Sequence, residues 1–374
     1  MRTELNAFVA LEAEPRKTAS GVLDGMRIAV KDNIDVAGLP CAAGIGALRA
    51  RRPAADAPCV ARLRAQGALI IGKTNMDEAA LGALGDNPWF GRCENPRRAG
   101  YTPGGSSSGS AAAVAAGLCV AALGTDTLGS VRIPASYCGV VGYIPSAGLV
   151  DRAGVVPLAP SLDRVGVLAR TAADAAKVAS VMAARELAPA DPPARIGVLR
   201  GLEAFVAAPI VAAVDAAARR LSHRVIDTGS LDFAAARRAA WLIAEVEGAR
   251  VHAELLSDPA SELSPSVRAA LDFGRRADAH RIARAMNELE KAKTTLRRML
   301  EECEVLVLPT TPQTAFAFGT LVPQTQADLT ALANIAGLAA ISVPVPAPAG
   351  ELPVGLQCMG ARDELVLGVA ARLG

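Results

Sequence analysis

Short apolar runs alternate with longer alanine-rich or amphipathic segments along most of this chain. The apolar runs predict buried strands at 26–30, 68–71, 118–123, 194–199, 304–308, 340–344 and 354–359. Helical spacing of apolar positions or high alanine content predicts helices at 56–66, 74–81, 111–117, 171–185, 207–221, 233–256, 264–273, 276–301, 327–338 and 364–373.

Strands that alternate with helices are typical of an α/β fold. We therefore expect one large domain over residues 1–374, with a mixed central sheet and helices on both of its faces. A more variable helical section is expected at about 200–300, and a peripheral helix or arm at 1–20.

Composition and charge exclude several classes of partner. The chain has 374 residues, a net charge of +2 and 20% charged residues, so it lacks the basic surplus typical of nucleic-acid-binding and membrane-surface proteins. Aromatic residues make up 3%, which argues against base-stacking platforms. No apolar run approaches the roughly 18 residues of a membrane span. Seven scattered cysteines without a Cys-x-x-Cys pair are typical of a reducing compartment, and we expect a cytoplasmic protein.

Two Gly/Ser-rich loops, at 102–110 and 124–134, enclose the small-residue segment 111–123. A loop, a helix, a strand and a second loop return the chain to its starting point, so the hydroxyls of Ser106 and Ser130 can meet although they are 24 positions apart. Glycines let backbones approach closely and leave N–H groups unobstructed. Clustered hydroxyls and free amides suit an acyl-transfer site. A linker and a phosphate-binding loop are the alternatives, although the lysine of G-x-x-x-x-G-K-[ST] is absent.

Longer sequence matches add to this interpretation. The most specific stretches are GGSSSGSAAAVAAG at 104–117 and GTDTLGSVRIPA at 124–135. Others are AVKDN at 29–33, GKTNMDE at 72–78, VLPTTP at 307–312 and PVGLQ at 353–357. With these motifs the chain resembles the amidase signature family from about residue 20 to the C-terminus, most weakly at about 185–300. The resemblance implies that family's α/β fold and the hydrolysis of a carboxamide to an acid and ammonia or an amine.

The resemblance also implies a catalytic Ser–Ser–Lys arrangement. Ser130 would attack the amide carbonyl, Ser106, held in a cis peptide, would relay the proton, and Lys31 would be the base. A lysine that is neutral at pH 7 requires burial and no carboxylate partner. Asp32 and Asn33 are candidates to support Lys31. The oxyanion hole would consist of the backbone N–H groups of Thr127, Leu128, Gly129 and Ser130.

Other polar residues have simpler interpretations. A serine nucleophile usually relies on histidine, but His223, His252 and His280 lie in the weakly matching section, and we interpret them as surface or packing residues. No H-E-x-x-H motif or Cys/His cluster has metal-binding spacing, so we expect neither a metal nor another cofactor. We interpret Asp126 as an acceptor for loop amides and Arg132 as half of a buried ion pair rather than a substrate-binding residue.

The sequence departs from the family pattern at Leu128 and Ser108, where glycine is usual. Leucine avoids positive φ, so we expect a negative φ at Leu128 and a side chain that narrows the acyl pocket.

Three functions stay open: an amidohydrolase, the amidase subunit of a glutamine-dependent tRNA amidotransferase, and a non-catalytic binding protein on the same scaffold. We expect a small-molecule amide as the partner and neither nucleic acid nor membrane, and we leave a homodimer open.

Overall fold

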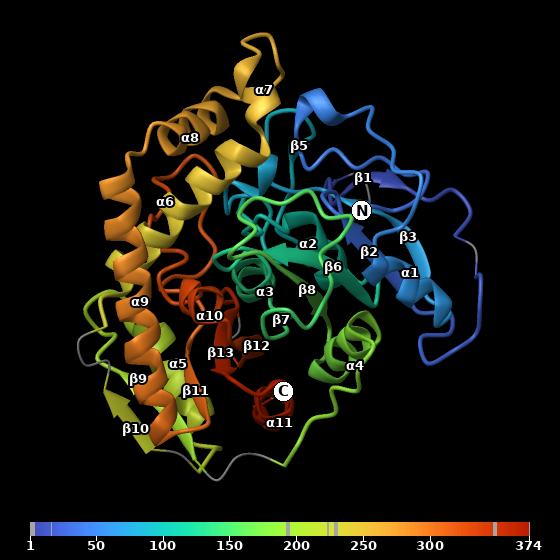
Figure 1. Ribbon diagram of the computed structural model, residues 1–374. Coiled ribbons are helices and arrows are strands. Elements are labelled where there is room, and N and C mark those ends of the chain that lie inside the picture. The colour runs from blue at the N-terminus through green and yellow to red at the C-terminus, as the bar shows by residue number, and fades with distance from the viewer. Residues whose placement is uncertain are drawn as a thin grey trace.

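A single mixed β-sheet runs through the computed structural model (Figure 1). The structure describes residues 4–15, 17–191, 195–222, 224–227, 231–346 and 350–373. Within these ranges the sheet has eleven strands, from edge to edge β1 (Phe8–Leu11), β3 (Leu69–Thr74), β2 (Arg27–Lys31), β6 (Ala121–Asp126), β8 (Arg164–Ala169), β7 (Val141–Ile144), β12 (Ala339–Val345), β13 (Val354–Gly360), β11 (Val305–Pro309), β9 (Ile196–Arg200) and β10 (Arg224–Asp227). A separate two-stranded ribbon consists of β4 (Asp86–Asn87) and β5 (Gly91–Arg92).

Strand direction brings the predicted catalytic segments to one end of the sheet. Strand β2 pairs in parallel with both β3 and β6, the strands from β6 to β11 pair antiparallel, and β11, β9 and β10 are parallel again. Because β2 and β6 are parallel neighbours, their carboxyl ends, Lys31 and Asp126, lie at the same edge. Ligand sites in α/β sheets usually lie at such carboxyl ends.

Helices cover both faces of the sheet. All six residues of β6 are buried, and because successive side chains point to opposite faces, both faces must be covered there. Two groups of helices lie near this part of the sheet: the contacting pair α2 (Ser108–Ala115) and α3 (Arg132–Cys138), and the layer of α1 (Pro58–Ala65), α4 (Ala172–Ala183) and α11 (Asp363–Leu373). The predicted α/β fold with flanking helices is confirmed.

The section after β9 is mostly helical. It contains α5 (Ala208–Ala218), α6 (Phe233–Val251), α7 (Ala253–Ser257), α8 (Pro265–Arg275) and α9 (Ala279–Glu302), and α10 (Ala331–Ala336) follows β11. Helix α6 packs against α8, α9 and α10, and this group stands beside the sheet (Figure 1). In the ranges that the structure describes, no helix combines the length and apolar character needed to cross a membrane.

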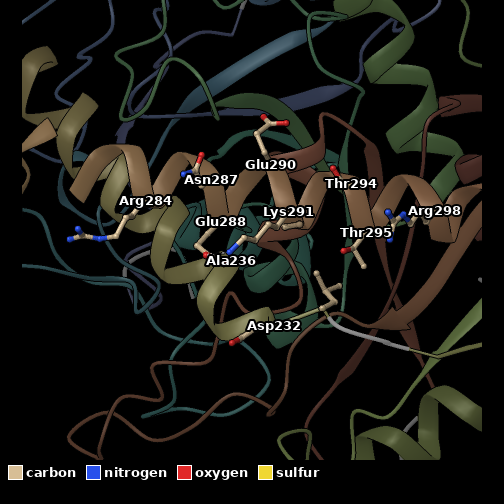
Figure 2. Close-up of a pocket in the computed structure, with 12 residues that line it drawn as sticks. Asp232, Ala236, Arg284, Asn287, Glu288, Glu290, Lys291, Thr294, Thr295 and Arg298 are labelled. Carbon is tan, nitrogen blue, oxygen red and sulfur yellow. Dashed lines mark hydrogen bonds and ion pairs between the residues drawn. The ribbon is translucent and has the colours of Figure 1, made fainter. Parts of the chain in front are cut away.

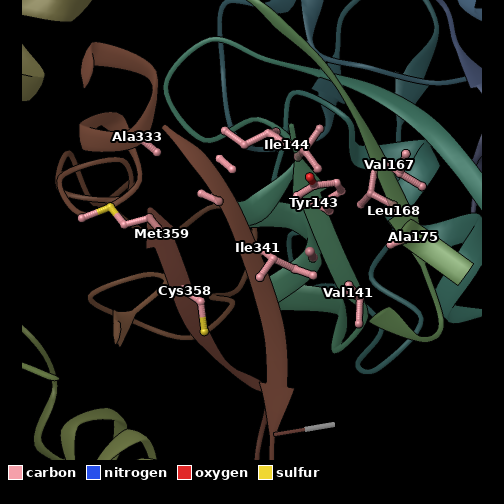
Figure 3. Packing of buried hydrophobic residues seen from close by; sticks show 14 of the residues in the cluster. Val141, Tyr143, Ile144, Val167, Leu168, Ala175, Ala333, Ile341, Cys358 and Met359 are labelled. Atoms are coloured by element: carbon pink, nitrogen blue, oxygen red, sulfur yellow. The ribbon is translucent and has the colours of Figure 1, made fainter. Parts of the chain in front are cut away.

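Small and branched apolar side chains fill the core between sheet and helices (Figure 3). Tyr143 and Val167 come from the adjacent strands β7 and β8, Ile341 and Cys358 from β12 and β13, and all four are fully buried. Burial of one such aliphatic side chain stabilises the fold by about 1.5–3 kcal/mol. The core therefore holds the strands that carry the site in fixed register.

The strand predicted at 118–123 starts later than expected. Helix α2 ends in a cap in which Gly117 has φ +69° and the N–H groups of Gly117 and Leu118 donate to the carbonyls of Val114 and Ala113. This cap uses residues that the apolar pattern assigned to the strand. Strand β6 begins at Ala121, opposite Ile28 of β2.

Two other predictions of local structure are wrong. The helix predicted at 74–81 is replaced by the end of β3, which pairs Thr74 with Lys31 of β2, and by a short 3₁₀ turn at Glu78–Ala80. The predicted N-terminal helix or arm contains strand β1, which pairs antiparallel with β3.

Some elements did not stand out in the sequence. Helix α3 and strands β8 and β10 were not predicted, because α3 contains a proline and the two strands depend on pairing with distant partners. Residue 194 of the predicted strand 194–199, residues 192–193 and His223 lie outside the described residues.

Candidate active site

Lys31 ends β2 with its amino group enclosed by the fold. The side chain is fully buried. Its Nζ lies 2.8 Å from Ser106 Oγ, 2.8 Å from Thr125 Oγ1 and 3.3 Å from the Thr125 carbonyl oxygen. Three oxygens at these distances match the three N–H donors of an ammonium group. Strand β2 thus delivers Lys31 to the serine loop 104–110, as the resemblance implies.

Burial lowers the pKa of Lys31 from 10.5 to about 7, because the charged form loses its hydration. Three carboxylates oppose this shift through their negative charge: Asp77, Asp126 and Asp163. Among the described residues, none of them forms an ion pair with Lys31, so desolvation prevails. Near neutral pH a large fraction of Lys31 is therefore uncharged.

The surroundings of Lys31 also suit the neutral amine. A neutral amine has two N–H donors and one lone pair. When both oxygens of Thr125 accept these N–H groups, the lone pair is left to receive the hydroxyl proton of Ser106. Asn33 holds Thr125 in place, since its Nδ2 donates to Thr125 Oγ1 at 3.1 Å and to the Val156 carbonyl at 3.1 Å.

Of the two residues predicted to support Lys31, Asn33 does so through Thr125, whereas Asp32 faces another lysine. Asp32 lies 3.7 Å from Lys73 Nζ and accepts the N–H of Ala42 at 3.1 Å. Burial raises the pKa of Asp32 to about 6, although Lys73 lowers it. Asp32 thus organises the loop after β2 rather than the lysine beside the serines.

The two Gly/Ser-rich loops meet, as the sequence predicts. The Ser107 N–H donates to the Ser130 carbonyl at 3.1 Å, and the peptide bond Gly105–Ser106 is cis. Ser106 is fully buried against Lys31, while Ser130 is 8% exposed and lines a cavity. In the part of the chain that is described, the Ser130 hydroxyl forms no hydrogen bond, so it is free to face a bound substrate.

The backbone of residues 127–130 has the properties of an oxyanion hole. Among the hydrogen bonds between described residues, none uses the N–H groups of these four positions. Gly129 has φ +140°, and a Cβ there would lie 2.2 Å from Thr330 Oγ1, so only glycine fits. Thr330 Oγ1 donates to the Leu128 carbonyl at 2.6 Å and fixes the loop from outside. Residues 127–130 thus offer four backbone N–H donors without a partner in the described residues, which is what an oxyanion hole requires.

Leu128 has no positive φ, in agreement with the prediction from its side chain. It is 5% exposed and lines the same cavity as Ser130. The isobutyl group therefore occupies part of the cavity wall that a glycine would leave open.

Asp126 and Arg132 form a fully buried ion pair that closes the nucleophile loop. Arg132 Nη2 lies 2.9 Å from Asp126 Oδ1 and Nε lies 3.1 Å from Oδ2, and Oδ2 also accepts the Val131 N–H at 3.0 Å. Burial alone would raise the pKa of Asp126, but the Arg132 guanidinium and hydrogen bonds from Val131 and Asn334 together hold the pKa below its usual range. Arg132 also donates to Gln357 Oε1 at 2.6 Å. The structural interpretation of both residues is confirmed.

Arg132→Met should reduce the free energy of unfolding by about 3–5 kcal/mol, because it leaves the Asp126 carboxylate buried and unpaired. Urea unfolding at pH 7 measures this loss. Arg275→Met is the matched control, since Arg275 is 56% exposed and pairs with Asp272 on the surface, and it should cost less than about 1 kcal/mol. Equal losses in the two variants would contradict a structural role for the buried pair.

The cavity beside Ser130 has a volume of about 410 Å³. All four predicted oxyanion residues line it. The rest of the lining is mostly apolar and comes from the segment after β3, from α3, α6, the loop before β8 and the loop before α10: Ala80, Gly82, Ala83, Leu84, Ile133, Leu158, Arg237, Trp241, Ala244, Val322, Pro323, Gln324, Gln326 and Ala327. Such a concave, largely apolar space with few polar groups is typical of a small-molecule site.

A larger cavity, of about 860 Å³, lies between α6 and α9 (Figure 2). Its lining is rich in charged side chains of α9, and Lys291 pairs with Glu288 at 2.7 Å on the same helix. Neither Lys31 nor either serine lines it. It has no reactive group comparable to Ser130, and we assign the site to the smaller cavity.

His252 and His280, the two described histidines, do not contact the two serines. His252 is buried without a hydrogen-bond partner for Nε2, and burial lowers its pKa to about 4. His280 is exposed on α9. Neither forms a hydrogen bond with Ser106 or Ser130 in the described residues. The described residues also contain no group of three or more His, Cys, Asp or Glu side chains placed to hold a metal ion.

The fold is that of an enzyme class that acts on amide C–N bonds. A family model described as Amidase matches residues 4–367, and the chain belongs to this family. The A subunit of glutamyl-tRNA(Gln) amidotransferase from Anaeromyxobacter dehalogenans is 37% identical over 437 aligned positions, which cover 99% of this chain and 88% of that protein.

Solved structures agree. A crystal structure of an amidase has a TM-score of 0.90 and 32% identity, with coverage of 99% of this chain and 92% of the other. The A subunit of the glutamyl-tRNA(Gln) amidotransferase of Thermotoga maritima has a TM-score of 0.85 and 30% identity, covering 100% and 87%. The chain is therefore an amidase-family enzyme with an amide C–N bond as its target.

Thr125, Asp77 and the cavity wall are parts of the site for which the sequence predicted no role. Thr125 holds Lys31, Asp77 adds negative charge near it, and the cavity wall comes from α6 and the loop before α10. Thr125 and Asp77 both lie in the quoted family stretches, which was an available signal. The cavity wall lies in the weakly matching section and the variable loops, where no pattern identified it.

Proposed function

We propose that this chain hydrolyses uncharged carboxamides through an acyl-enzyme on Ser130, with Ser106 and Lys31 as its proton relay. The observation that carries this proposal is the buried Lys31 amine, 2.8 Å from Ser106 Oγ and without an ion-pair partner in the described residues. A Ser–Lys pair of this kind is a recurring variant of the serine-hydrolase triad.

Acylation begins with Lys31 neutral. As Ser130 Oγ bonds to the amide carbon, its proton passes to Ser106 Oγ while the Ser106 proton passes to Lys31 Nζ. The carbonyl π electrons move to oxygen, and the N–H groups of residues 127–130 stabilise this oxyanion, with each donor worth roughly 3–4 kcal/mol.

Collapse of the tetrahedral intermediate reverses the relay. Lys31 returns a proton through Ser106 to the amide nitrogen, the C–N bond breaks, and ammonia or an amine leaves. Water then attacks the ester on Ser130 by the same relay. It releases the acid and restores the neutral lysine and both hydroxyls.

The cavity favours an uncharged acyl group. Arg237, the charged side chain in its lining, donates from Nε to Asp328 Oδ1 at 2.6 Å, and the two side chains are 16% and 4% exposed. A free amino acid would bring an ammonium and a carboxylate, whereas the charged side chain in the cavity lining is already paired. An apolar acyl group needs no such exchange.

Ammonia release by the purified chain from a panel of alkyl, aryl and amino-acid amides tests this function. We expect turnover of neutral apolar amides and little turnover of glutamine. Absence of ammonia release from every amide would contradict the proposal.

Sedimentation velocity of the same purified protein would test whether it forms a homodimer. A nucleic-acid gel shift would test the predicted lack of nucleic-acid binding.

A second candidate is the amidase subunit of a glutamine-dependent tRNA amidotransferase. The relative at 37% identity and the Thermotoga maritima structure both carry that name. Preferential release of ammonia from glutamine, especially in the presence of a partner subunit, would favour this candidate over the free-standing amidase.

Leu128→Gly should broaden the tolerated acyl group more than it changes the rate on the smallest amides. The variant removes the isobutyl group from the cavity wall, while the N–H of position 128 is retained. The ratio of kcat/KM between a bulky and a small amide measures the effect. A substrate range equal to that of the wild type would refute the proposed role of Leu128.

A further inference from the structure

One polar side chain on the cavity wall is held by a hydrogen bond from a buried tyrosine. Gln326 is 7% exposed, lines the cavity beside Ser130, and accepts a hydrogen bond at Oε1 from the Tyr137 hydroxyl at 3.1 Å. Tyr137 is fully buried and belongs to α3, the helix that begins two residues after Ser130. Gln326 precedes by four positions Thr330, which contacts the oxyanion loop. Gln326 therefore lies between a direct contact with α3, which follows Ser130, and a nearby contact with the loop that precedes Ser130.

In the structure, a chain of hydrogen bonds engages the oxygen end of the Gln326 amide. The Thr325 hydroxyl donates to Gln313 Oε1 at 3.3 Å, and Gln313 Nε2 donates to the Tyr137 oxygen at 2.6 Å. A tyrosine hydroxyl has one proton. Because Tyr137 accepts from Gln313, it gives that proton to Gln326 Oε1, and the NH₂ group of Gln326 is the end that remains.

This NH₂ group has no hydrogen-bond partner among the described residues. Ile133, Ala327 and Trp241 line the same cavity, whose lining is mostly apolar. An alkyl substrate that fills the cavity would take the NH₂ group out of water without replacing its hydrogen bonds, which is unfavourable. A substrate with an oxygen at that point would replace them.

We propose that Gln326 is a specificity-determining residue that binds a neutral hydrogen-bond acceptor, a second carbonyl oxygen, on the acyl side of the substrate. This inference rests on the proposed amidase function and narrows its substrates to amides whose apolar acyl chain carries such an oxygen. A neutral acceptor fits better than a carboxylate, since Gln326 is uncharged and Arg237 already pairs with Asp328.

The test compares amides that end in a methyl ketone with branched alkanamides of the same length, in which a CH–CH₃ group replaces the carbonyl. The series varies the spacer between the scissile amide and the ketone. At one spacer length the wild type should favour the ketone in kcat/KM by about three- to tenfold, the effect of one neutral hydrogen bond. A ratio of one or less at every spacer length overturns the proposal.

Substitutions test whether the preference for the ketone depends on Gln326. Gln326→Leu should abolish the preference, and Tyr137→Phe should reduce it, because the amide is then free to rotate. Gln66→Leu is the control, because this glutamine lies at the C-terminal cap of α1 and does not line the cavity, and it should keep the wild-type ratio. The proposal is also overturned if the preference for the ketone survives in both Gln326→Leu and Tyr137→Phe. If Gln326→Leu fails to fold, the result for Tyr137→Phe alone decides.

Calorimetry can measure how tightly the ketone amide and the matched alkyl amide bind to Ser130→Ala. This measurement separates the inference about Gln326 from the proposed function. If the wild type hydrolyses no amide but Ser130→Ala still binds the ketone more tightly by the same factor, the hydrolysis proposal fails and the role of Gln326 stands. If simple amides are hydrolysed but ketone and alkyl compounds bind equally, only the role of Gln326 fails.

Discussion

Ser130→Ala should lower kcat/KM for amide hydrolysis by at least about 10⁴-fold, the scale seen when the nucleophile of a serine hydrolase is removed. The variant deletes the atom that forms the acyl-enzyme and leaves the backbone donors of the oxyanion loop in place. Ser130 is 8% exposed and its hydroxyl has no hydrogen bond among described residues, so the fold should lose little stability. Ammonia release and thermal unfolding of the same preparation measure the two effects. Activity within about tenfold of wild type would falsify the assignment of the nucleophile.

Hydroxylamine gives a second test of the acyl-enzyme. It should intercept the ester on Ser130 and yield a hydroxamate, because it is a better nucleophile than water toward an acyl group. Ser130→Ala should form none. Rapid ammonia release without hydroxamate would instead indicate direct attack of water on the amide.

Lys31→Met should reduce activity at neutral pH by several orders of magnitude, because it removes the base that accepts the Ser106 proton. In the wild type, kcat/KM should rise with pH and level off above the pKa of Lys31, about 7, since only the neutral amine can act. The pKa of Lys31 is lowered rather than raised because desolvation disfavours the ammonium form. A pH–rate profile from about pH 5 to about pH 9 measures this rise. A flat profile would exclude Lys31 as the base.

Stability provides an independent measure of the same pKa. Lys31 binds a proton less readily in the folded than in the unfolded state, so its charge opposes folding below about pH 7, and this cost decreases as the pH rises toward 10.5. The free energy of unfolding of the wild type relative to Lys31→Met should therefore increase across that window.

His280→Gln is a control for the histidine alternative, because this exposed residue lies on α9, and it should retain full activity. Loss of activity in that variant would redirect the search for the base.

The relation of the site to the sequence differs from residue to residue. Lys31 follows an apolar run, and the serines lie in loops around a segment of small residues, so the parts of the relay could be located from local pattern and family resemblance. The candidate oxyanion loop was proposed on the same grounds. In each case the signal is local, because backbone conformation and strand formation depend on neighbouring residues.

The protonation and the contacts of these residues could not be predicted in this way. Burial lowers the pKa of Lys31, and burial is produced by the packing of β2, β6 and the serine loop, which come from separate parts of the chain. Thr125 lies 94 positions from the lysine it holds. The start of β6 at Ala121 likewise depends on its pairing with Ile28, which no local pattern contains.

The sequence by itself determined the α/β class and the two loops and indicated the candidate reactive groups, because these follow from short-range periodicity and from motifs. Only the tertiary structure decided the chemistry that surrounds them. The hydrogen bond from Tyr137 to Gln326 joins residues 189 positions apart, and the pair of Arg237 and Asp328 joins a helix to a distant loop. The physical reason is that substrate cavities form where distant elements pack, and residue spacing along a chain carries little information about such contacts.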